Sequence, residues 1–151
     1  MEKTKKETIK KTIEAFFEKM DLKDCLEKIE IKENLVSFQL QTDDPEILIG
    51  KKGQTLFAVQ HLLSKILNHK TKERLILDFD VNQYKKKKLK YLKELAQNTA
   101  DQVSLTKKEK ALPPMSSFER RIVHLALSKR EDVQTESQGQ EPERRVIIKP
   151  R

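Results

Sequence analysis

The turn Gly50-Lys51-Lys52-Gly53 is the stretch of this chain best suited to hold an anion. The chain has three glycines, and two of them bracket this pair of lysines. Glycine accepts backbone conformations closed to other residues and lets another molecule approach the main chain. Apolar residues with helical spacing flank the turn, so the unpaired N–H groups of the second helix would lie beside two ammonium groups. The pattern suits a phosphate-binding turn, but a glycine-rich turn between two helices is more often a plain connection, and it is the surrounding order of elements that favours the phosphate-binding interpretation.

Arg120 and His124 form a second pair of candidate binding residues. At positions i and i+4 of a helix, the two side chains point the same way. A cation beside an aromatic ring with hydrogen-bonding nitrogens can hold a phosphate and contact an unpaired base. The alternative is structural: Arg120 would form an ion pair with an acid, and His124 would fill a gap at the surface.

The helix that carries this pair has a recognisable start. Ser116 followed three residues later by Glu119 matches a capping box, which predicts a helix from there to about Lys129. The helical period separates two faces. We expect the core face to hold Phe118, Ile122, Leu125 and Ala126, and the other face to hold Arg120, Arg121, His124 and Ser128. Replacing Arg120 and His124 is therefore expected to cost little stability.

A run of four lysines, Lys85, Lys86, Lys87 and Lys88, opens a predicted helix over residues 82–104. Positive charge at a helix N-terminus opposes the helix dipole, so the run is mildly unfavourable for the helix itself. Phosphate contacts are one reason for such a run, and a plain solvated helix is the other. The sequence does not separate the two.

Catalytic and metal-binding patterns find little support. The nearest helical neighbour of His124 is a cation, which lowers the basicity of the imidazole. His61 and His69 lie eight residues apart on a helix, too far to share a metal ion. No Lys-Ser or Lys-Thr follows Gly53, so the glycine turn is not a Walker loop. We expect no enzyme activity, no cofactor and no metal, with a nuclease that uses His124 as a minor alternative.

Composition indicates a polyanionic partner and a reducing compartment. The formal net charge is +8, and the whole excess lies in residues 82–151, which contain 17 lysines and arginines against 9 acidic residues. The single cysteine, Cys25, excludes an internal disulfide framework and is expected at the start of a strand. No apolar window approaches the length of a membrane span, so a cytoplasmic protein is expected.

The first half of the chain predicts the element order helix, strand, strand, helix, helix, strand. An amphipathic helix over residues 3–20 carries interleaved lysines and glutamates, typical of a solvated face. Two alternating segments around Ile31 and Phe38 predict strands joined by a turn at Glu33-Asn34. Asp44-Pro45 is expected to start the helix before the glycine turn, with Asp44 as N-cap. Leu75, Leu77 and Phe79 predict the last strand, with Ile76 suggesting partial cover on the second face.

The second half predicts a long helix, a short extended segment at residues 110–114, the capped helix and two final strands. These strands, at residues 133–137 and 145–149, are joined by a turn at 138–142. The whole chain is therefore expected to be an α+β protein in two parts, residues 1–81 and 82–151.

The order in residues 1–81, with Gly50 and Gly53 at the glycine positions of a GxxG loop between helices, resembles a bacterial-type KH domain. Phe118-Glu119-Arg120-Arg121-Ile122-Val123-His124 is similar to the signature of the R-three-H domain, with Arg120 and His124 at the matching positions. A KH domain followed by an R-three-H domain resembles the Jag family of bacterial proteins, also called KhpB or EloR.

This resemblance implies a cytoplasmic regulator that binds single-stranded RNA, or single-stranded DNA, in the control of cell elongation, division or sporulation. It also implies a small single-KH protein, KhpA, as partner. Many family members begin with a separate small N-terminal domain, and this chain is expected to begin at the KH helix. A protein scaffold that uses the KH half, with nucleic acid secondary, is the other reading.

Overall fold

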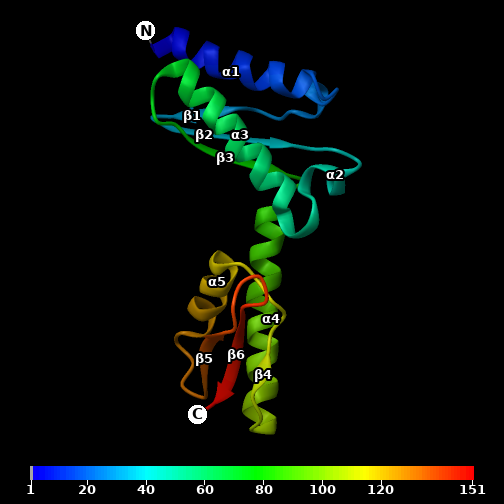
Figure 1. Ribbon diagram of the computed structural model, residues 1–151, viewed down its shortest axis with the longest axis vertical. Helices are drawn as coiled ribbons and strands as arrows, with labels where there is room; N and C mark the ends of the chain where they lie inside the picture. The colour runs from blue at the N-terminus through cyan, green and yellow to red at the C-terminus, as the bar shows by residue number, and fades with distance from the viewer. Residues whose placement is uncertain (1) are drawn as a thin grey trace. The chain divides into compact units, whose positions relative to one another are not determined.

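The computed structural model describes residues 2–151 and divides into two compact units, one extending to Lys85 and the other spanning Lys86–Arg151 (Figure 1). The elements follow the expected order, and the α+β class is confirmed. In chain order they are α1 (Glu2–Glu18), η1 (Lys23–Cys25), β1 (Glu30–Lys32), β2 (Leu35–Leu40), α2 (Pro45–Ile49), η2 (Lys51–Gly53), α3 (Gln54–Thr71), β3 (Ile76–Val81), α4 (Tyr84–Thr106), β4 (Lys110–Ala111), α5 (Ser117–Leu127), β5 (Val133–Gln138) and β6 (Arg145–Pro150).

The first unit packs α1 and α3 against a three-stranded sheet in the order β1-β2-β3 (Figure 1). β1 and β2 are antiparallel, and their register joins Lys32 to Leu35, which confirms the turn at Glu33-Asn34. β3 runs parallel to β2, which requires a crossover such as the two helices between them. The core contains a cluster of Phe17, Phe38 and Phe79, whose ring centroids lie 5.1 to 5.9 Å apart.

Two expectations for this unit are corrected by the structure. Ile76 is 56% exposed, so the second face of the sheet is not covered there. Leu77 and Phe79 of β3 point into the core on the other face. Cys25 ends the short helix η1 rather than starting a strand. Asp44 is the N-cap residue of α2 and Pro45 lies at the start of the helix, as expected, although the Asp44 side chain makes no capping hydrogen bond.

The second unit consists of α4 and α5 packed with an antiparallel sheet in the order β4-β6-β5. Leu92, Ala96 and Val103 of α4 are buried with Val146 and Ile148 of β6. Leu89, an apolar residue near the start of α4, is exposed because this core begins at Leu92. Within residues 2–151, no helix is long and apolar enough to cross a membrane.

Helix α5 presents only part of the expected face to the core: Ile122 and Ala126 pack against it as predicted. Its capping box is present: the Ser116 side chain accepts a hydrogen bond from the Glu119 amide, and the Glu119 carboxylate accepts one from the Ser116 amide. Phe118 and Leu125, however, are 69% and 62% exposed, whereas Arg120 is only 8% exposed. Rotating the core face onto Arg120, Val123 and Leu127 is tolerated because the guanidinium finds hydrogen-bonding partners inside the unit.

Candidate nucleic-acid interface

The Gly50–Gly53 turn joins α2 to α3 through three unusual backbone conformations. Gly50 has φ 70° and ψ −175°, a region that is essentially restricted to glycine. Lys52 is left-handed at φ 55°, and Gly53 is left-handed at φ 80°. Hydrogen bonds hold the two ends: the Gly50 amide donates to the Glu46 carbonyl at 2.8 Å, and the Gly53 amide donates to the Gly50 carbonyl at 3.4 Å.

Both glycines are also required by close packing. A Cβ added at Gly50 would lie 2.8 Å from the Thr55 Cβ and nearer still to the Thr55 hydroxyl. A Cβ added at Gly53 would lie 3.0 Å from the ring of Tyr84. The turn is thus compact, and its first and last residues, Gly50 and Gly53, have no side chain.

The lysines of the turn project at the start of α3. Lys51 and Lys52 are exposed, whereas Gly53 is buried. The N-cap residue of α3 is Gly53, which has no side chain to occupy the first N–H groups of the helix. The Gln54 amide already donates to the Lys51 carbonyl, so a phosphate would be bound by the positive end of this 18-residue helix and by the two ammonium groups.

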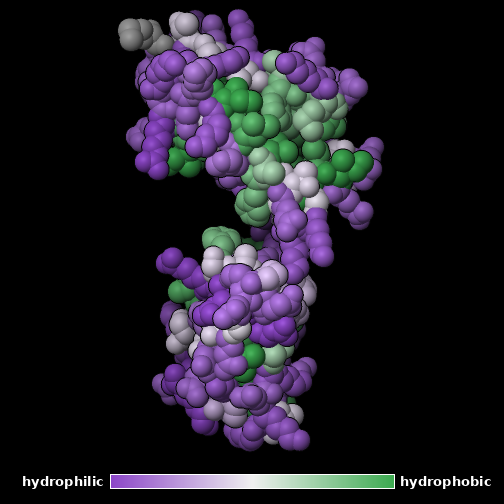
Figure 2. Space-filling view, viewed as in Figure 1, coloured by the Kyte–Doolittle hydropathy of each residue, from purple (hydrophilic) through white to green (hydrophobic). Residues whose placement is uncertain are grey.

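Exposed apolar side chains flank the turn, a feature that the sequence pattern did not predict. Ile47 of α2 and Phe57 of α3 are both exposed, although each belongs to an apolar helical segment. Figure 2 shows hydrophobic side chains gathered over α2 and α3 on the visible face of the first unit. Unpaired bases are flat and apolar on their faces, so such side chains suit them better than a duplex.

The lysine run at the start of α4 separates into two kinds of residue. The Lys85 ammonium donates to Gln60 Oε1 at 2.7 Å and to Asp78 Oδ1 at 3.1 Å, and lies 5.7 Å from the Phe57 ring centroid. The Lys88 ammonium lies 3.6 Å from Glu119. Lys85 and Lys88 therefore hold helices in place, while Lys86 and Lys87 point into solvent.

Asp80 offsets the unfavourable charge of this run. Its carboxylate accepts hydrogen bonds from the Val81 amide at 2.8 Å and from the Lys85 amide at 3.1 and 3.2 Å. Partial burial raises the pKa of Asp80, while its bonds to the two amides and the Lys85 charge lower it in part. An acid at this position complements the N-terminal end of α4, which explains how the helix tolerates lysines in its first turn.

Arg120 is held inside the second unit. Its Nη1 donates to the Met115 carbonyl at 2.7 Å and to Glu141 Oε1 at 2.8 Å. Burial of the side chain contradicts our expectation that Arg120 lies on a solvent face and contributes little to stability. The structural alternative, an ion pair with an acid, describes this arrangement, and Glu141 itself remains exposed.

His124 lies at the border of the buried face of α5. Its Nδ1 and the Thr135 hydroxyl of β5 are 2.6 Å apart, so the ring is oriented by the sheet. Arg121 lies three residues before it, is exposed and has no ion pair within residues 2–151. Of the three predicted residues on α5, Arg121 is therefore the most accessible, His124 is partly accessible, and Arg120 is buried.

Three neighbouring residues, Arg144, Ser137 and Thr135, escaped the sequence analysis as parts of this site. Arg144 donates from Nε to the Ser137 hydroxyl at 3.1 Å and from Nη1 to the Gly139 carbonyl at 2.8 Å. Thr135 and Ser137 are two residues apart on β5, so they point to the same side of the strand. His124 and Arg144 consequently bind adjacent hydroxyls. The sequence contained the arginine, but only the register of β5 and β6 reveals its partner.

The environment of His124 predicts its titration. Burial lowers the pKa of His124 from 6.5, and the positive charge of Arg120 lowers it further. We expect an NMR titration midpoint below 6.5, so the ring is neutral at pH 7. The pKa of His124 is lower in the folded than in the unfolded protein. The contribution of His124 to the free energy of unfolding is therefore fully present above pH 6.5 and is lost as the pH falls through the folded pKa.

Added salt provides the control for this titration. It screens Arg120 but leaves burial unchanged, so the midpoint should rise with salt while staying below 6.5. A midpoint at or above 6.5 at low salt would contradict the described environment of the ring.

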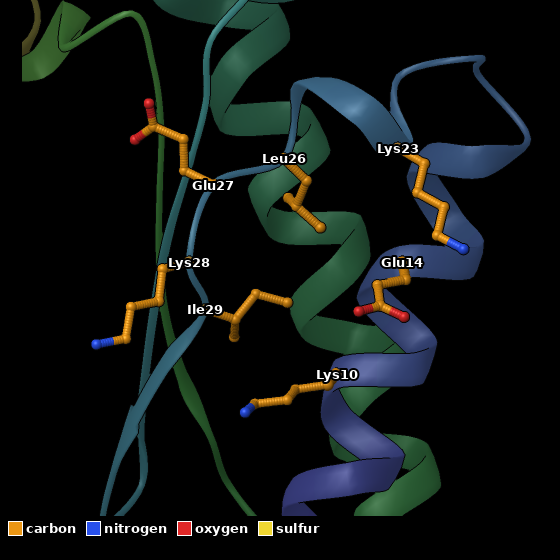
Figure 3. Close-up of a pocket in the computed structure, with 7 residues that line it drawn as sticks. All are labelled: Lys10, Glu14, Lys23, Leu26, Glu27, Lys28 and Ile29. Atoms are coloured by element: carbon orange, nitrogen blue, oxygen red, sulfur yellow. The ribbon is translucent and has the colours of Figure 1, made fainter.

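A depression of about 320 Å³ lies between α1 and the segment leading into β1 (Figure 3). Lys10, Lys23, Lys28, Glu14 and Glu27 surround an apolar floor of Leu26 and Ile29. Cations and acids alternate around it, so it has no strong preference for an anion. Among residues 2–151, no cluster of histidine, cysteine or acidic side chains could hold a metal ion.

Comparison with known proteins agrees with both halves of the fold. Residues 6–79 match the family model described as the KhpA/KhpB KH domain, and residues 90–150 match the model of the R-three-H domain. The chain is thus a KH protein with a following R-three-H domain.

Its relatives include proteins named RNA-binding protein KhpB from Clostridium symbiosum (40% identical over 116 residues, 77% of this chain and 52% of the relative), Bacillus subtilis (36% over 115 residues, 75% and 55%) and Lactiplantibacillus plantarum (36% over 112 residues, 74% and 35%). The chain belongs to the KhpB/Jag family, as its residues predicted. It spans about half the length of the first of these relatives, and about a third of the Lactiplantibacillus protein.

Proposed function

We propose that this chain binds single-stranded RNA, and does so as a binding protein rather than an enzyme. The observation that carries the proposal is the GKKG turn, which places two exposed lysines at the N-terminus of α3, beside the partly exposed main chain of Gly50. The names of the relatives, all RNA-binding proteins, support the same ligand.

The proposed contacts divide between a KH domain at residues 1–81 and an R-three-H domain at residues 82–151. In the first, Gly50 and Gly53 let the backbone of the strand approach, while Lys51 and Lys52 neutralise phosphates. In the second, Arg121 contacts a phosphate and His124 a base. Arg120 supports this face from behind through Met115 and Glu141. Lys86 and Lys87 add phosphate contacts, and Lys85 and Lys88 position α4.

Reversing the charge of the turn tests the proposal. Lys51→Asp with Lys52→Asp should keep the melting temperature and weaken binding of a single-stranded RNA oligonucleotide by about tenfold or more at moderate salt. Both lysines are exposed, and aspartate tolerates the left-handed conformation at position 52. Fluorescence anisotropy at several salt concentrations measures the affinity, and duplex RNA of the same sequence should bind less tightly.

The matched control places the same charge change on α1, as Lys6→Asp with Lys10→Asp. These lysines are also exposed in the first unit, so overall charge falls equally in both variants. Equal affinities of the two variants would remove the turn from the proposal. An unchanged affinity of the turn variant would favour the scaffold reading, in which the KH half binds protein and nucleic acid is secondary.

We further propose a KhpA-like single-KH protein as partner and a role in cell elongation, division or sporulation, in the cytoplasm. The support is family membership, since the matched KH model is shared by KhpA and KhpB. Co-purification of the tagged chain with a single-KH protein, and altered cell length or spore yield in a deletion strain, would support this role. Normal cells and no co-purified KH protein would contradict it.

A further inference from the structure

One face of α4 carries four exposed lysines that the GKKG turn and the α5 residues do not account for. Lys86, Lys87, Lys90 and Lys93 are all exposed, and none of their ammonium groups has an ion pair or hydrogen bond with another residue among 2–151. Tyr91, also on the outer side of this helix, is 53% exposed. We call these five residues the α4 lysine face.

Helical geometry places the lysines on a continuous track. At about 100° per residue, Lys86, Lys90 and Lys93 fall within roughly 60° of one another, and they rise over about 10 Å along the axis. The neighbouring side of the helix, roughly 110° from the centre of this track, is fixed because Leu92 and Ala96 are buried in the core of the second unit. The lysines therefore stay on the solvent side of the helix, and each ammonium group can contact a separate anionic group.

The charge of this face is not neutralised by acids within its own stretch of sequence. Glu94 is the one acid among residues 84–94. Helix α1 is also rich in lysine, but there Glu7, Glu14 and Glu18 are interspersed along the helix. Asp80 complements the lysines in the first turn of α4, but Lys90 and Lys93 lie beyond that turn.

Tyr91 gives the face a feature that a merely solvated helix does not need. Its ring lies 5.5 Å from the Lys88 ammonium and four residues after Lys87, so cations flank an exposed aromatic ring. An unpaired base can stack on such a ring while the neighbouring lysines hold its phosphates. A duplex offers no accessible base face for this contact.

We propose that the α4 lysine face is a further binding site for single-stranded nucleic acid, with the phosphate backbone along Lys86, Lys90 and Lys93 and a base stacked on Tyr91. This inference rests on the proposed function for its ligand and shares Lys86 and Lys87 with it; Lys90, Lys93 and Tyr91 are new, and the face includes neither the GKKG turn nor Arg120 and His124. An acidic protein segment would use the lysines without the ring, and the experiment separates the two.

The test is the triple variant Lys86→Ala, Lys90→Ala and Lys93→Ala in the full chain. Alanine favours the helix, so the fold should be retained. Affinity for a single-stranded RNA oligonucleotide should fall by about tenfold or more, and the slope of log affinity against log salt should fall by about 2, because three phosphate contacts are lost. Tyr91→Ala should weaken binding without changing the slope, and Tyr91→Phe should restore it.

The control removes the same charge from α1 as Lys3→Ala, Lys6→Ala and Lys10→Ala, at similar helical spacing. Equal losses in the two triple variants would reduce the effect to overall charge and overturn the inference. So would normal RNA binding by the α4 variant together with lost binding of poly-glutamate, which would identify an acidic protein partner. Suppose that the wild type binds RNA and that the Lys51/Lys52 variant does not. An α4 variant with unchanged affinity would then refute this inference alone. If the wild type binds no RNA, the proposed function fails as well.

Discussion

Replacing Arg120 with alanine is expected to lower the free energy of unfolding of the second unit by about 2–3 kcal/mol. The substitution removes the donor to the Met115 carbonyl and to Glu141 and also removes an aliphatic stem from a nearly closed site. Glu141 is exposed and can be hydrated, so the larger part of the loss comes from the buried carbonyl and from packing.

The control is Arg121→Ala, one residue along the same helix. Arg121 is exposed, so its replacement should change stability by no more than about 0.5 kcal/mol. Urea unfolding, combined with hydrogen exchange of the α5 and β5 amides, assigns the loss to the second unit. Equal and small effects of the two variants would contradict the buried position of Arg120.

Because Arg120 is buried and Arg121 is exposed, the proposed binding residues of α5 are best tested one at a time. A double Arg120/His124 variant would mix a folding defect with a lost ligand contact. His124→Ala removes a partly accessible ring bonded to Thr135 and leaves the Arg120 bonds intact. Arg121→Ala removes a solvent cation, so these single variants report on the ligand more directly.

Sequence periodicity predicted the elements that depend on local pattern. Alternation around Phe38 and Phe79 predicted strands whose alternate residues enter the core, and that is the observed burial. The capping box at Ser116 predicted the start of α5 because its two hydrogen bonds lie within four residues. The conformation of the GKKG turn likewise depends mainly on its own glycines, which the sequence displays.

Features that depend on distant partners were not predictable in this way. Phe118 and Leu125 were assigned to the core because they are apolar, whereas the observed core face includes an arginine. That choice depends on Glu141, 21 residues from Arg120 and brought close by the turn between β5 and β6. Similarly, Lys85 and Lys88 differ from Lys86 and Lys87 through partners on β3 and α5 that the helical period does not reveal.

The effect of Gly50→Ala should be among the largest in the chain. If the backbone keeps its conformation, the free energy of unfolding of the first unit should fall by about 3 kcal/mol. If the turn rearranges instead, RNA affinity should fall by about tenfold or more. Gly50 combines a conformation closed to alanine with contact to Thr55, so either the backbone moves or the strain is kept.

Two further variants separate these causes. Adding Thr55→Ala to Gly50→Ala removes the nearest atom and should restore only part of the loss, because the backbone conformation remains unfavourable. Gly139→Ala, at φ 94° but with its nearest neighbours 3.4 Å away, tests strain without severe crowding and should leave RNA binding by the first unit unchanged. Thermal melts and anisotropy on the three variants measure both effects. Normal stability together with normal RNA affinity in Gly50→Ala would show that neither the described turn conformation nor its proposed role in binding is correct, since no alanine fits that backbone beside Thr55 without a cost.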